Sequence, residues 1–372
     1  MSIIAGKPGV GGTSKPMMRA RVMGAALAVL AAMFGLMPSS ARAVGFVDPL
    51  DEPAVMDNRA THEPLLAVTK AGDRLVAVGL RGLIIYSDDQ GVNWRQANVP
   101  VQCDLTAVNF IDAKSGWAAG HNGVILHTED GGLRWIKQFD GRDNLAFKAF
   151  YQKKVDAGDA SAKPYVQILA LNTHDGPALP SLDVLFENAH DGYAVGPYGM
   201  IMATHDGGSH WLPWLDRIDN PEFLYLNAIA AIGGEIYISG EKGKVYKLDR
   251  VRQYFVSMDT KYTGSFLGIT GKDNLLLAYG MLGHLYRSVD AGTNWQPIQT
   301  SLKSSISGAA LLTGGRIVLA SQSGQLAVGN PQNDAFKDVM IKNVFPSSGI
   351  AVTGGNGLAV VGPGGVVVSQ LP

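Results

Sequence analysis

The sequence predicts an all-β protein, a seven-bladed β-propeller whose blades are four-stranded antiparallel sheets. Two repeated motifs and their spacing support this prediction. A Gly-x-x-Gly turn begins at Gly79, Gly120, Gly196, Gly240 and Gly280, with looser copies at Ser321 and Gly362. Successive turns begin 41, 76, 44, 40, 41 and 41 residues apart. A period near forty, with about four short apolar strands per unit, is typical of a propeller blade.

The first 43 residues have the pattern of a secretory signal peptide. Basic residues precede an apolar run over residues 22–37, and a small-x-small cleavage site ends at Ala43. The run of 16 residues is shorter than the roughly 20 that a membrane-spanning helix needs. We therefore expect translation to begin near Met17, cleavage to follow Ala43, and the product to be exported, as a periplasmic protein.

Charge and cysteine content argue against several kinds of partner and cofactor. Residues 1–43 hold five of the 31 basic residues and none of the 32 acidic ones, so the rest of the chain has a formal charge of −6. That charge disfavours nucleic acid as a partner. Cys103 is the only cysteine; it can form neither an intramolecular disulfide nor a thiolate zinc cluster. We expect it to pack as a small hydrophobe, and we expect no metal or cofactor, because the histidines show no ligand-like spacing.

Each repeat contains the four strands of one blade. Blade two shows them at residues 105–109, 116–119, 124–127 and 135–138. The last repeat, from Gly349, has only three such strands before the sequence ends at Pro372. Because an open ring leaves two unpaired strand edges, we expect residues 46–58 to close the propeller, which spans residues 44–372, as the fourth strand of the last blade.

The spacing of 76 residues leaves room for an extra element at about residues 140–180. It is either an eighth, degenerate blade or an insertion between blades two and three. Residues 144–155 read as a helix, residues 157–163 as a polar tip, and only residues 165–171 as a strand. The apolar residues of the helix fall on roughly one side: Leu145, Phe147, Phe150 and Tyr151. One strand does not make a blade, so the insertion is favoured.

A second motif, Ser/Thr-x-Asp-x-Gly-x-x-Trp, lies between the third and fourth strands of four blades. This is the Asp-box, or bacterial neuraminidase repeat. Its copies are Ser87, Asp89, Gly91 and Trp94; Thr128, Asp130, Gly132 and Trp135; Thr204, Asp206, Gly208 and Trp211; and Ser288, Asp290, Gly292 and Trp295. The carboxylate can accept N–H groups of its own turn, the glycine closes the hairpin, and the tryptophan fills the space between blades. We therefore expect a structural role for these residues.

The two motifs are expected on opposite rims of the propeller, because the second and third turns of a four-stranded meander lie at opposite ends. The Gly-x-x-Gly rim also receives the connections between blades, and loops that converge on a rigid scaffold favour binding. The mixture of charged, aromatic and apolar side chains in these turns favours contact with a protein over catalysis or a small-molecule ligand. The candidate partner-binding residues are Arg81, His121, Asn122, Tyr198, Glu241, Lys242, Met281 and His284.

A Gly-x-x-Gly turn followed about five residues later by an Asp-box, as in residues 78–94, resembles a unit of the photosystem II stability/assembly factor family. Residues 182–211 and 275–295 are similar, and the resemblance covers nearly the whole chain after the signal segment. It implies a seven-bladed, non-enzymatic, exported propeller that binds assembly intermediates of a membrane complex, with Arg81 at a basic contact position. We therefore expect a periplasmic scaffold for a client protein or membrane complex during assembly or export.

The enzymatic alternative is a sialidase-like glycoside hydrolase, because sialidases also carry Asp-boxes. Such an enzyme needs three arginines for the substrate carboxylate, a nucleophile pair and an acid. The inner strands lack the Arg-Ile-Pro start of sialidases, and Arg74, Arg287 and Arg316 fall elsewhere in their blades. The sequence therefore favours the scaffold.

Overall fold

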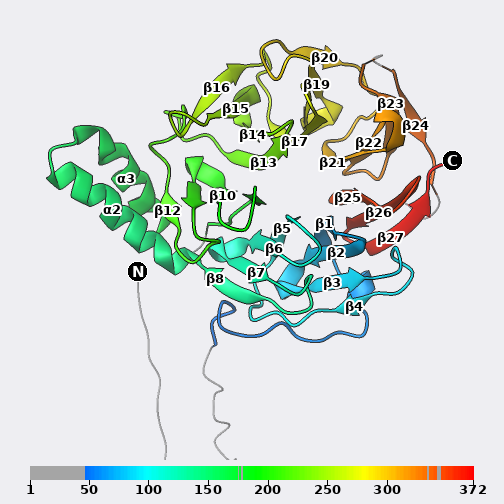
Figure 1. Ribbon diagram of the computed structural model, residues 1–372, viewed down its shortest axis with the longest axis horizontal. Coiled ribbons are helices and arrows are strands. Elements are labelled where there is room, and N and C mark those ends of the chain that lie inside the picture. Colours follow the sequence, from blue (N-terminus) through cyan, green and yellow to red (C-terminus); the bar gives the residue numbers. More distant parts are fainter. Residues whose placement is uncertain (1–46, 175, 177–178, 333–334, 342–344) are drawn as a thin grey trace, which may run out of the picture. The chain divides into compact units, whose positions relative to one another are not determined.

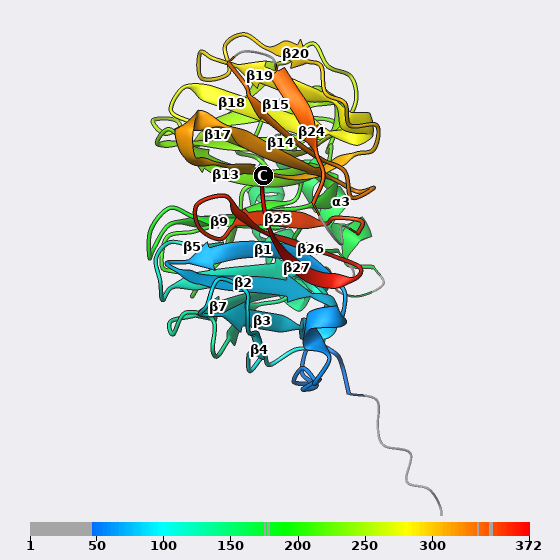
Figure 2. The same cartoon turned by 90° about the vertical axis from the view of Figure 1, so that its right-hand side faces the viewer.

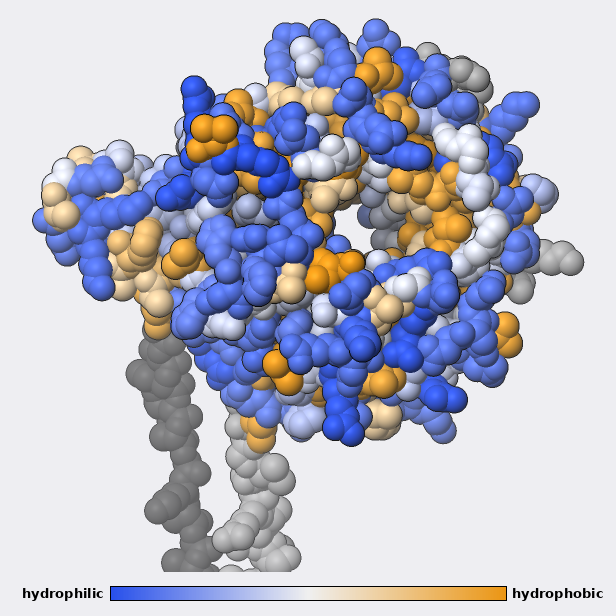
Figure 3. Space-filling view, viewed as in Figure 1, coloured by the Kyte–Doolittle hydropathy of each residue, from blue (hydrophilic) through white to orange (hydrophobic). Residues whose placement is uncertain are grey.

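The computed structural model describes residues 47–174, 176, 179–332, 335–341 and 345–372. The expected signal peptide, residues 1–43, lies outside this part. The described residues form seven antiparallel sheets, arranged around a central channel (Figures 1 and 3). The predicted seven-bladed propeller is confirmed, and we number its blades one to seven in chain order.

Within each blade the strands pair in sequence order, from the innermost to the outermost. The strands of blades one and two are β1 (Leu65–Ala71), β2 (Arg74–Gly79), β3 (Ile84–Ser87), β4 (Arg95–Gln96), β5 (Leu105–Phe110), β6 (Gly116–Gly120), β7 (Ile125–Thr128) and β8 (Ile136–Phe139). Those of blades three and four are β9 (Asp183–Phe186), β10 (Gly192–Val195), β11 (Ile201–Thr204), β12 (Leu212–Pro213), β13 (Leu226–Ile232), β14 (Glu235–Gly240), β15 (Lys244–Asp249) and β16 (Tyr254–Asp259).

Blades five to seven complete the ring. Their strands are β17 (Phe266–Lys272), β18 (Leu275–Gly280), β19 (Leu285–Ser288), β20 (Gln296–Ile298), β21 (Ile306–Leu311), β22 (Ile317–Ser321), β23 (Leu326–Asn330), β24 (Ala335–Val339), β25 (Gly349–Val352), β26 (Gly357–Gly362) and β27 (Gly365–Gln370). Short 3₁₀ helices lie in the connections: η1 (Ala60–His62), η2 (Leu80–Gly82), η3 (His121–Gly123), η4 (Gly141–Asp143), η5 (Ala160–Ala162), η6 (Pro197–Gly199), η7 (Glu241–Gly243), η8 (Met281–Gly283) and η9 (Thr313–Gly315).

The segment between blades two and three is an insertion, as favoured, and not an eighth blade. It forms a hairpin of two helices, α2 (Asn144–Asp156) and α3 (Lys163–Asn172), which projects from the ring (Figure 1). The prediction of a strand at residues 165–171 was wrong, because these residues belong to α3. A short apolar run is compatible with either period, and Pro164 near the start of α3 suits a first helical turn. No helix in the described ranges is long and apolar enough to cross a bilayer.

The apolar side predicted for the first helix was only half right. Phe147 and Tyr151 are buried, whereas Leu145 and Phe150 are exposed. The buried pair, four residues apart, faces one cluster with Trp117 of β6 and other apolar residues of blades two and three. The helical hairpin therefore shares a hydrophobic core with the blades that carry it.

Neighbouring blades are held together by buried rings. Trp117 stacks on Phe186 of β9 with ring centroids 3.6 Å apart, which joins blades two and three. Tyr193 of β10 meets Phe255 of β16 edge-on, with centroids 5.8 Å apart, which joins blades three and four. Burying each such side chain contributes roughly 1.5–3 kcal/mol. Apolar packing between sheets is thus a main source of the ring's stability.

The closing strand predicted from residues 46–58 does not form; Phe46 itself lies outside the described residues. The segment follows the outer side of blades one and two, where Ala54 N donates to Val99 O (3.0 Å) and Gln102 N donates to Pro49 O (2.7 Å). Leu50 is fully buried in the core of these blades, and its burial holds the segment there. The seventh sheet accordingly has three strands among the described residues, and blade seven closes the ring by packing against blade one.

Candidate functional site

The Asp-box carboxylates are bonded within their own turns. In blade one, Ser87 Oγ and Asn93 N each donate to Asp89 Oδ1 at 2.8 Å. The backbone and side chain of Asn93 hold the pKa of Asp89 at about 2. Asn294 does the same for Asp290, whose pKa is also about 2. Carboxylates bonded in this way hold their hairpins together and fit a structural role.

The first five Gly-x-x-Gly turns share one backbone shape. Each contains a single turn of 3₁₀ helix, and its third residue is left-handed although it is not glycine. These residues and their φ angles are Arg81 (53°), Asn122 (59°), Tyr198 (55°), Lys242 (52°) and Leu282 (56°). Four of the five are exposed and Asn122 is half-buried. The turns therefore present one variable side chain per blade along this rim.

The two glycines of each turn are required by two different chain segments: the first glycine meets the residue that leads into the inner strand of its own blade, and the second meets the connection to the next blade. A Cβ on Gly79 would lie 2.2 Å from Pro64 O, and one on Gly82 would lie 2.0 Å from Val101 O. Gly82 N also donates to Cys103 O at 2.7 Å. The turn thus packs against the entry to its own blade and against the next connection, and its third residue is the one that is generally exposed. Cys103 is buried, and burial raises the pKa of its thiol to about 11.

At blades one and two the rim carries paired charges. Arg81 is exposed, with a guanidinium nitrogen 3.7 Å from a Glu63 carboxylate oxygen. Asp104 accepts a hydrogen bond from Arg81 N at 2.8 Å, and its other oxygen lies 3.8 Å from His121 Nδ1. An open cavity of about 330 Å³ beside Arg81 is lined by Glu63, Leu80 and residues of the N-terminal segment. Arg81 and His121 therefore lie together, with Asn122 next to them.

At blades three and four the charges are again paired. Lys242 forms an ion pair with Glu222, and Glu241 accepts a hydrogen bond from Tyr225 N at 2.8 Å. Acidic side chains therefore face the cations on this part of the rim as well, so these described residues do not form a uniformly basic patch.

Four aromatic side chains gather beside the Gly-x-x-Gly turn of blade three. This aromatic rim cluster consists of Tyr165, Tyr198, Phe223 and Tyr225. The rings of Tyr198 and Tyr225 are 5.0 Å apart, and those of Tyr165 and Phe223 are 6.0 Å apart. A hydrogen bond to Tyr198 raises the pKa of Tyr225 to about 12. Phe223 is left-handed, with φ 53°, and its backbone lies against Gly199.

Only Tyr198 of this cluster was identified from the sequence. Phe223 and Tyr225 lie on the connection into blade four, and Tyr165 lies on α3, which was predicted as a strand. The signal that could have found them is the aromatic density of residues 221–225, next to a predicted turn. The remaining candidates, Met281 and His284, lie on blade five, where the His284 ring is 5.2 Å from Tyr262.

Asp183 at the start of β9 was also missed. Its Oδ2 accepts a hydrogen bond from Ile229 N of blade four, and its Oδ1 accepts one from Val184 N, each at 2.9 Å. The surrounding protein raises the pKa of Asp183 to about 7, although the side chain keeps some contact with solvent. The matching registers on the other inner strands hold only alanine or glycine, for example Ala67 and Ala107. Asp183 therefore links two inner strands in a position that is otherwise small and apolar.

The arginines considered for a sialidase do not converge. Arg74 pairs with Asp88 at 2.6 Å, Arg287 donates to Pro331 O, and Arg316 donates to Asn356. These contacts belong to different blades. In the part of the chain that the structure describes, no group of three or more His, Cys, Asp or Glu side chains is placed to hold a metal ion.

Comparison with known proteins gives matches in sequence and in fold. The family model described as photosynthesis system II assembly factor YCF48 matches residues 68–157 and 158–338. A curated relative, the photosystem II assembly lipoprotein Ycf48 of Synechococcus sp. (strain CC9902), is 30% identical over 66 residues. That alignment covers 17% of this chain and 20% of the relative.

Solved structures resemble the propeller at low identity. A structure of YCF48 bound to D1 peptide is 15% identical, covers 86% of this chain and 99% of that chain, and has a TM-score of 0.58. YCF48 from Cyanidioschyzon merolae is 14% identical, with coverages of 86% and 98% and a TM-score of 0.59. The WD40 propeller domain of Doa1 reaches a TM-score of 0.60 at 10% identity, with coverages of 87% and 96%. These structural matches show the fold.

Proposed function

The chain belongs to the photosystem II assembly factor YCF48 family, and on that premise we propose that it is a non-enzymatic propeller that binds a client protein while a membrane complex is assembled or a protein is exported. A related propeller has been solved with a peptide of another protein bound to it. This supports a protein, and not a small molecule or nucleic acid, as the partner. We place the contact on the Gly-x-x-Gly rim.

The aromatic rim cluster is the observation that carries this proposal. Tyrosines with one apolar face and one polar tip are enriched at the centres of protein interfaces. Tyr198 is 40% exposed, and its ring meets that of Tyr225 edge-on, with centroids 5.0 Å apart. Lys242 and Glu222 lie on the neighbouring turn and connection, where a polar border would surround an aromatic contact. This combination suits a folded or extended segment of a client protein.

We also propose that the protein is exported, as a periplasmic scaffold. The basic stretch, the apolar run and the cleavage motif that ends at Ala43 support this location. N-terminal sequencing of the protein from an envelope fraction should give a chain that begins at Val44. A chain that keeps residues 17–43 and stays in the cytoplasm would contradict the proposed location.

A rim variant tests the binding surface. Arg81, Tyr198 and Lys242 replaced together by alanine should lose a client that the wild-type chain captures from gently solubilised, cross-linked membranes. Exposed ion pairs contribute roughly 0–1 kcal/mol each, and the ring contact between Tyr198 and Tyr225 contributes roughly 0.5–1.5 kcal/mol. Capture is therefore compared at a temperature at which the variant and the wild type are both folded. The matched control replaces three exposed residues outside the Gly-x-x-Gly turns, Lys114, Val251 and Arg252, and should keep the client. Equal capture by both variants would refute the proposed surface.

A further inference from the structure

Blade seven differs from the other six in its outermost strand. Six sheets have four strands, whereas the described residues of the seventh form only β25, β26 and β27. In that sheet β27, the third strand, is therefore outermost. Figure 2, which faces this side of the molecule, shows β27 on the outer wall of the ring, with η1 near it.

The register of the hairpin shows which backbone groups face outward. Gly362 pairs with Gly365 across a two-residue turn, and the ladder continues without a bulge to Gln370. Hydrogen-bonded and non-hydrogen-bonded pairs alternate along an antiparallel ladder. The N–H and C=O groups of residues 365, 367 and 369 therefore point toward β26 and form hydrogen bonds with it. The same groups of Val366, Val368 and Gln370 point away from the sheet, and no strand among the described residues pairs with them.

The surroundings leave part of this edge open. η1 covers its beginning, where a Cβ on Gly365 would lie 1.9 Å from Thr61 O. Further along, Val368 lies against Gly91 of the blade-one Asp-box, and the next residue, Val92, is 78% exposed. The open edge therefore runs from about Val367 to Gln370, with an exposed apolar residue near it.

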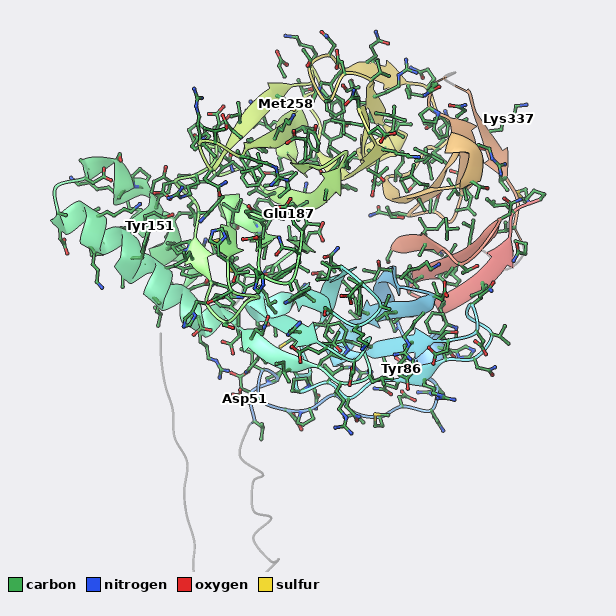
Figure 4. The ribbon with its side chains drawn as sticks, in the orientation of Figure 1. Asp51, Tyr86, Tyr151, Glu187, Met258 and Lys337 are labelled. Carbon is green, nitrogen blue, oxygen red and sulfur yellow. The ribbon has the colours of Figure 1, made fainter. Side chains whose placement is uncertain are left out.

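At two other blade junctions a fourth strand lies against the Asp-box glycine of the next blade, whereas at the junction of blades one and two Gly132 lies against Val76 of the second strand, β2. The Asp-box glycine of blade three lies against Gln138 of β8, and that of blade five lies against Met258 of β16; Figure 4 labels Met258. Both of these partners belong to fourth strands. In blade seven the partner, Val368, belongs to the third strand. The Asp-box turn of blade one is thus a surface of the kind on which a fourth strand rests at two other junctions.

The edge also lacks the features by which proteins usually protect such strands. β27 reads Gly-Val-Val-Val-Ser-Gln, with neither the charged residues nor the proline that discourage strand pairing. Valines favour extended backbone. The segment predicted to cover this edge was residues 46–58. Its described part, residues 47–58, is instead held on blades one and two by Leu50 and by hydrogen bonds to Val99 and Gln96.

We propose that β27 is the docking edge for an extended segment of a partner protein, which joins the seventh sheet as its fourth, antiparallel strand. Backbone hydrogen bonds would give affinity, and alternate side chains would give specificity. The other fourth strands have between two and six residues, so a segment of similar length fits. It should be uncharged, with β-branched or aromatic residues on the side that faces Val92.

A partner segment fits this edge better than a second copy of the chain. Two rings meeting along their curved outer walls would share little more than one short strand, well below the roughly 1,200 Å² typical of a stable interface. An extended segment of a partner protein can instead lie along β27 without bringing a second curved wall against the ring. The β27 edge lies on the outer wall of the ring, away from the aromatic rim cluster, so it would be a second binding site in addition to the rim.

A synthetic peptide tests the inference. The probe is a fluorescein-labelled copy of residues 253–258, which are uncharged and hold five of the six residues of β16. In this fold β16 is the fourth strand that pairs with the six-residue third strand β15. Fluorescence anisotropy should show saturable binding to the full chain. Val368→Pro removes one outward N–H and leaves the β26 ladder intact, so it should weaken binding about tenfold or more, as a loss of roughly 1.4 kcal/mol would. Val368→Thr keeps the N–H and should bind as the wild type does.

Each outcome supports or contradicts the proposal that β27 binds an extended segment of a partner protein. Absence of saturable binding, or equal binding by Val368→Pro and wild type at equal melting temperature, would overturn the proposal. Self-association of the wild-type chain that Val368→Pro abolishes would assign the edge to a second copy, which also overturns it. The rim variant at Arg81, Tyr198 and Lys242 should bind the peptide normally. Failure at the edge is therefore distinguishable from failure of the rim.

Discussion

Tyr151→Phe should destabilise the protein by removing the hydrogen bond that joins the helical hairpin to blade three. Tyr151 on α2 is fully buried (labelled in Figure 4). Its hydroxyl donates to Asp216 Oδ1 at 2.8 Å and accepts a hydrogen bond from Asp216 N at 3.3 Å. Lys154 pairs with the other carboxylate oxygen. Because hydrogen bonds to charged groups contribute roughly 1.5–3 kcal/mol, we expect a loss of about 2 kcal/mol.

Thermal and denaturant unfolding measure this loss. At roughly 2.1 cal/mol/K of unfolding entropy per residue, 2 kcal/mol corresponds to a fall of roughly 3 °C in the melting temperature of a propeller of this size. Phenylalanine keeps the aromatic ring of Tyr151, so the substitution leaves only a small cavity. The change in the free energy of unfolding therefore reports the contribution of the hydroxyl group. Tyr165→Phe is the matched control, since Tyr165 packs against Tyr151 and its hydroxyl has no hydrogen-bond partner among the described contacts; it should cost less than about 0.5 kcal/mol.

A double-mutant cycle tests the assigned partner. In an Asp216→Ala background, Tyr151→Phe should cost much less, with a coupling energy of roughly 1–2 kcal/mol. An unchanged melting temperature for Tyr151→Phe, or a coupling energy near zero, would refute the reasoning. It would also remove the support for a rigid hairpin that places Tyr165 beside Phe223.

Three further predictions concern the pH dependence and the N-terminal segment. The pKa of Asp183 is about 7 in the native state and 3.8 in an unperturbed carboxyl group. Between these two values the native state keeps a proton that the unfolded state has lost, so the free energy of unfolding falls as the pH rises from about 4 to 7. The melting temperature of Asp183→Asn minus that of wild type should therefore increase from about pH 5 to pH 8, and a constant difference would contradict this. Asp89 and Asp290, with pKa values of about 2, stabilise the fold above about pH 4 and lose that effect toward pH 2; their asparagine variants should show a shallower loss in acid melts, and an acid limb as steep as that of wild type would contradict this. Leu50→Ala should cost roughly 2–5 kcal/mol in denaturant unfolding, whereas the exposed Val47→Ala should cost little; equal effects would show that Leu50 does not anchor the segment.

The architecture was predictable because the repeated turns are local. A Gly-x-x-Gly turn needs two positions without a Cβ, since the entry to its own blade packs on the first and the connection to the next blade packs on the second. That requirement leaves a visible period in the sequence. The Asp-box is predictable for the same reason, because its serine or threonine, aspartate and glycine bond within a few residues of one another. Such features do not depend on the rest of the fold.

The features that were missed depend on contacts between distant segments. Residues 165–171 form a helix because they pack on α2. A short apolar run does not indicate this packing, since it is compatible with either a helix or a strand. Residues 47–58 lie on blades one and two because Leu50 finds a buried site there. Phe223 and Tyr225 join Tyr198 only when the connection into blade four folds over the turn of blade three. Burial raises the pKa of Asp183, and its hydrogen-bond partner Ile229 is more than forty residues away in the sequence.

Site-specific photo-cross-linking in intact cells tests the central claim, that the Gly-x-x-Gly rim holds a client protein, most directly. A photoreactive phenylalanine analogue in place of Tyr198 should form one discrete cross-linked product with another protein. The same analogue in place of Val251, which is 95% exposed and lies in the blade-four turn between β15 and β16, should not form it. The same product at both positions, or none at Tyr198 in cells where the protein is present and folded, would contradict the account.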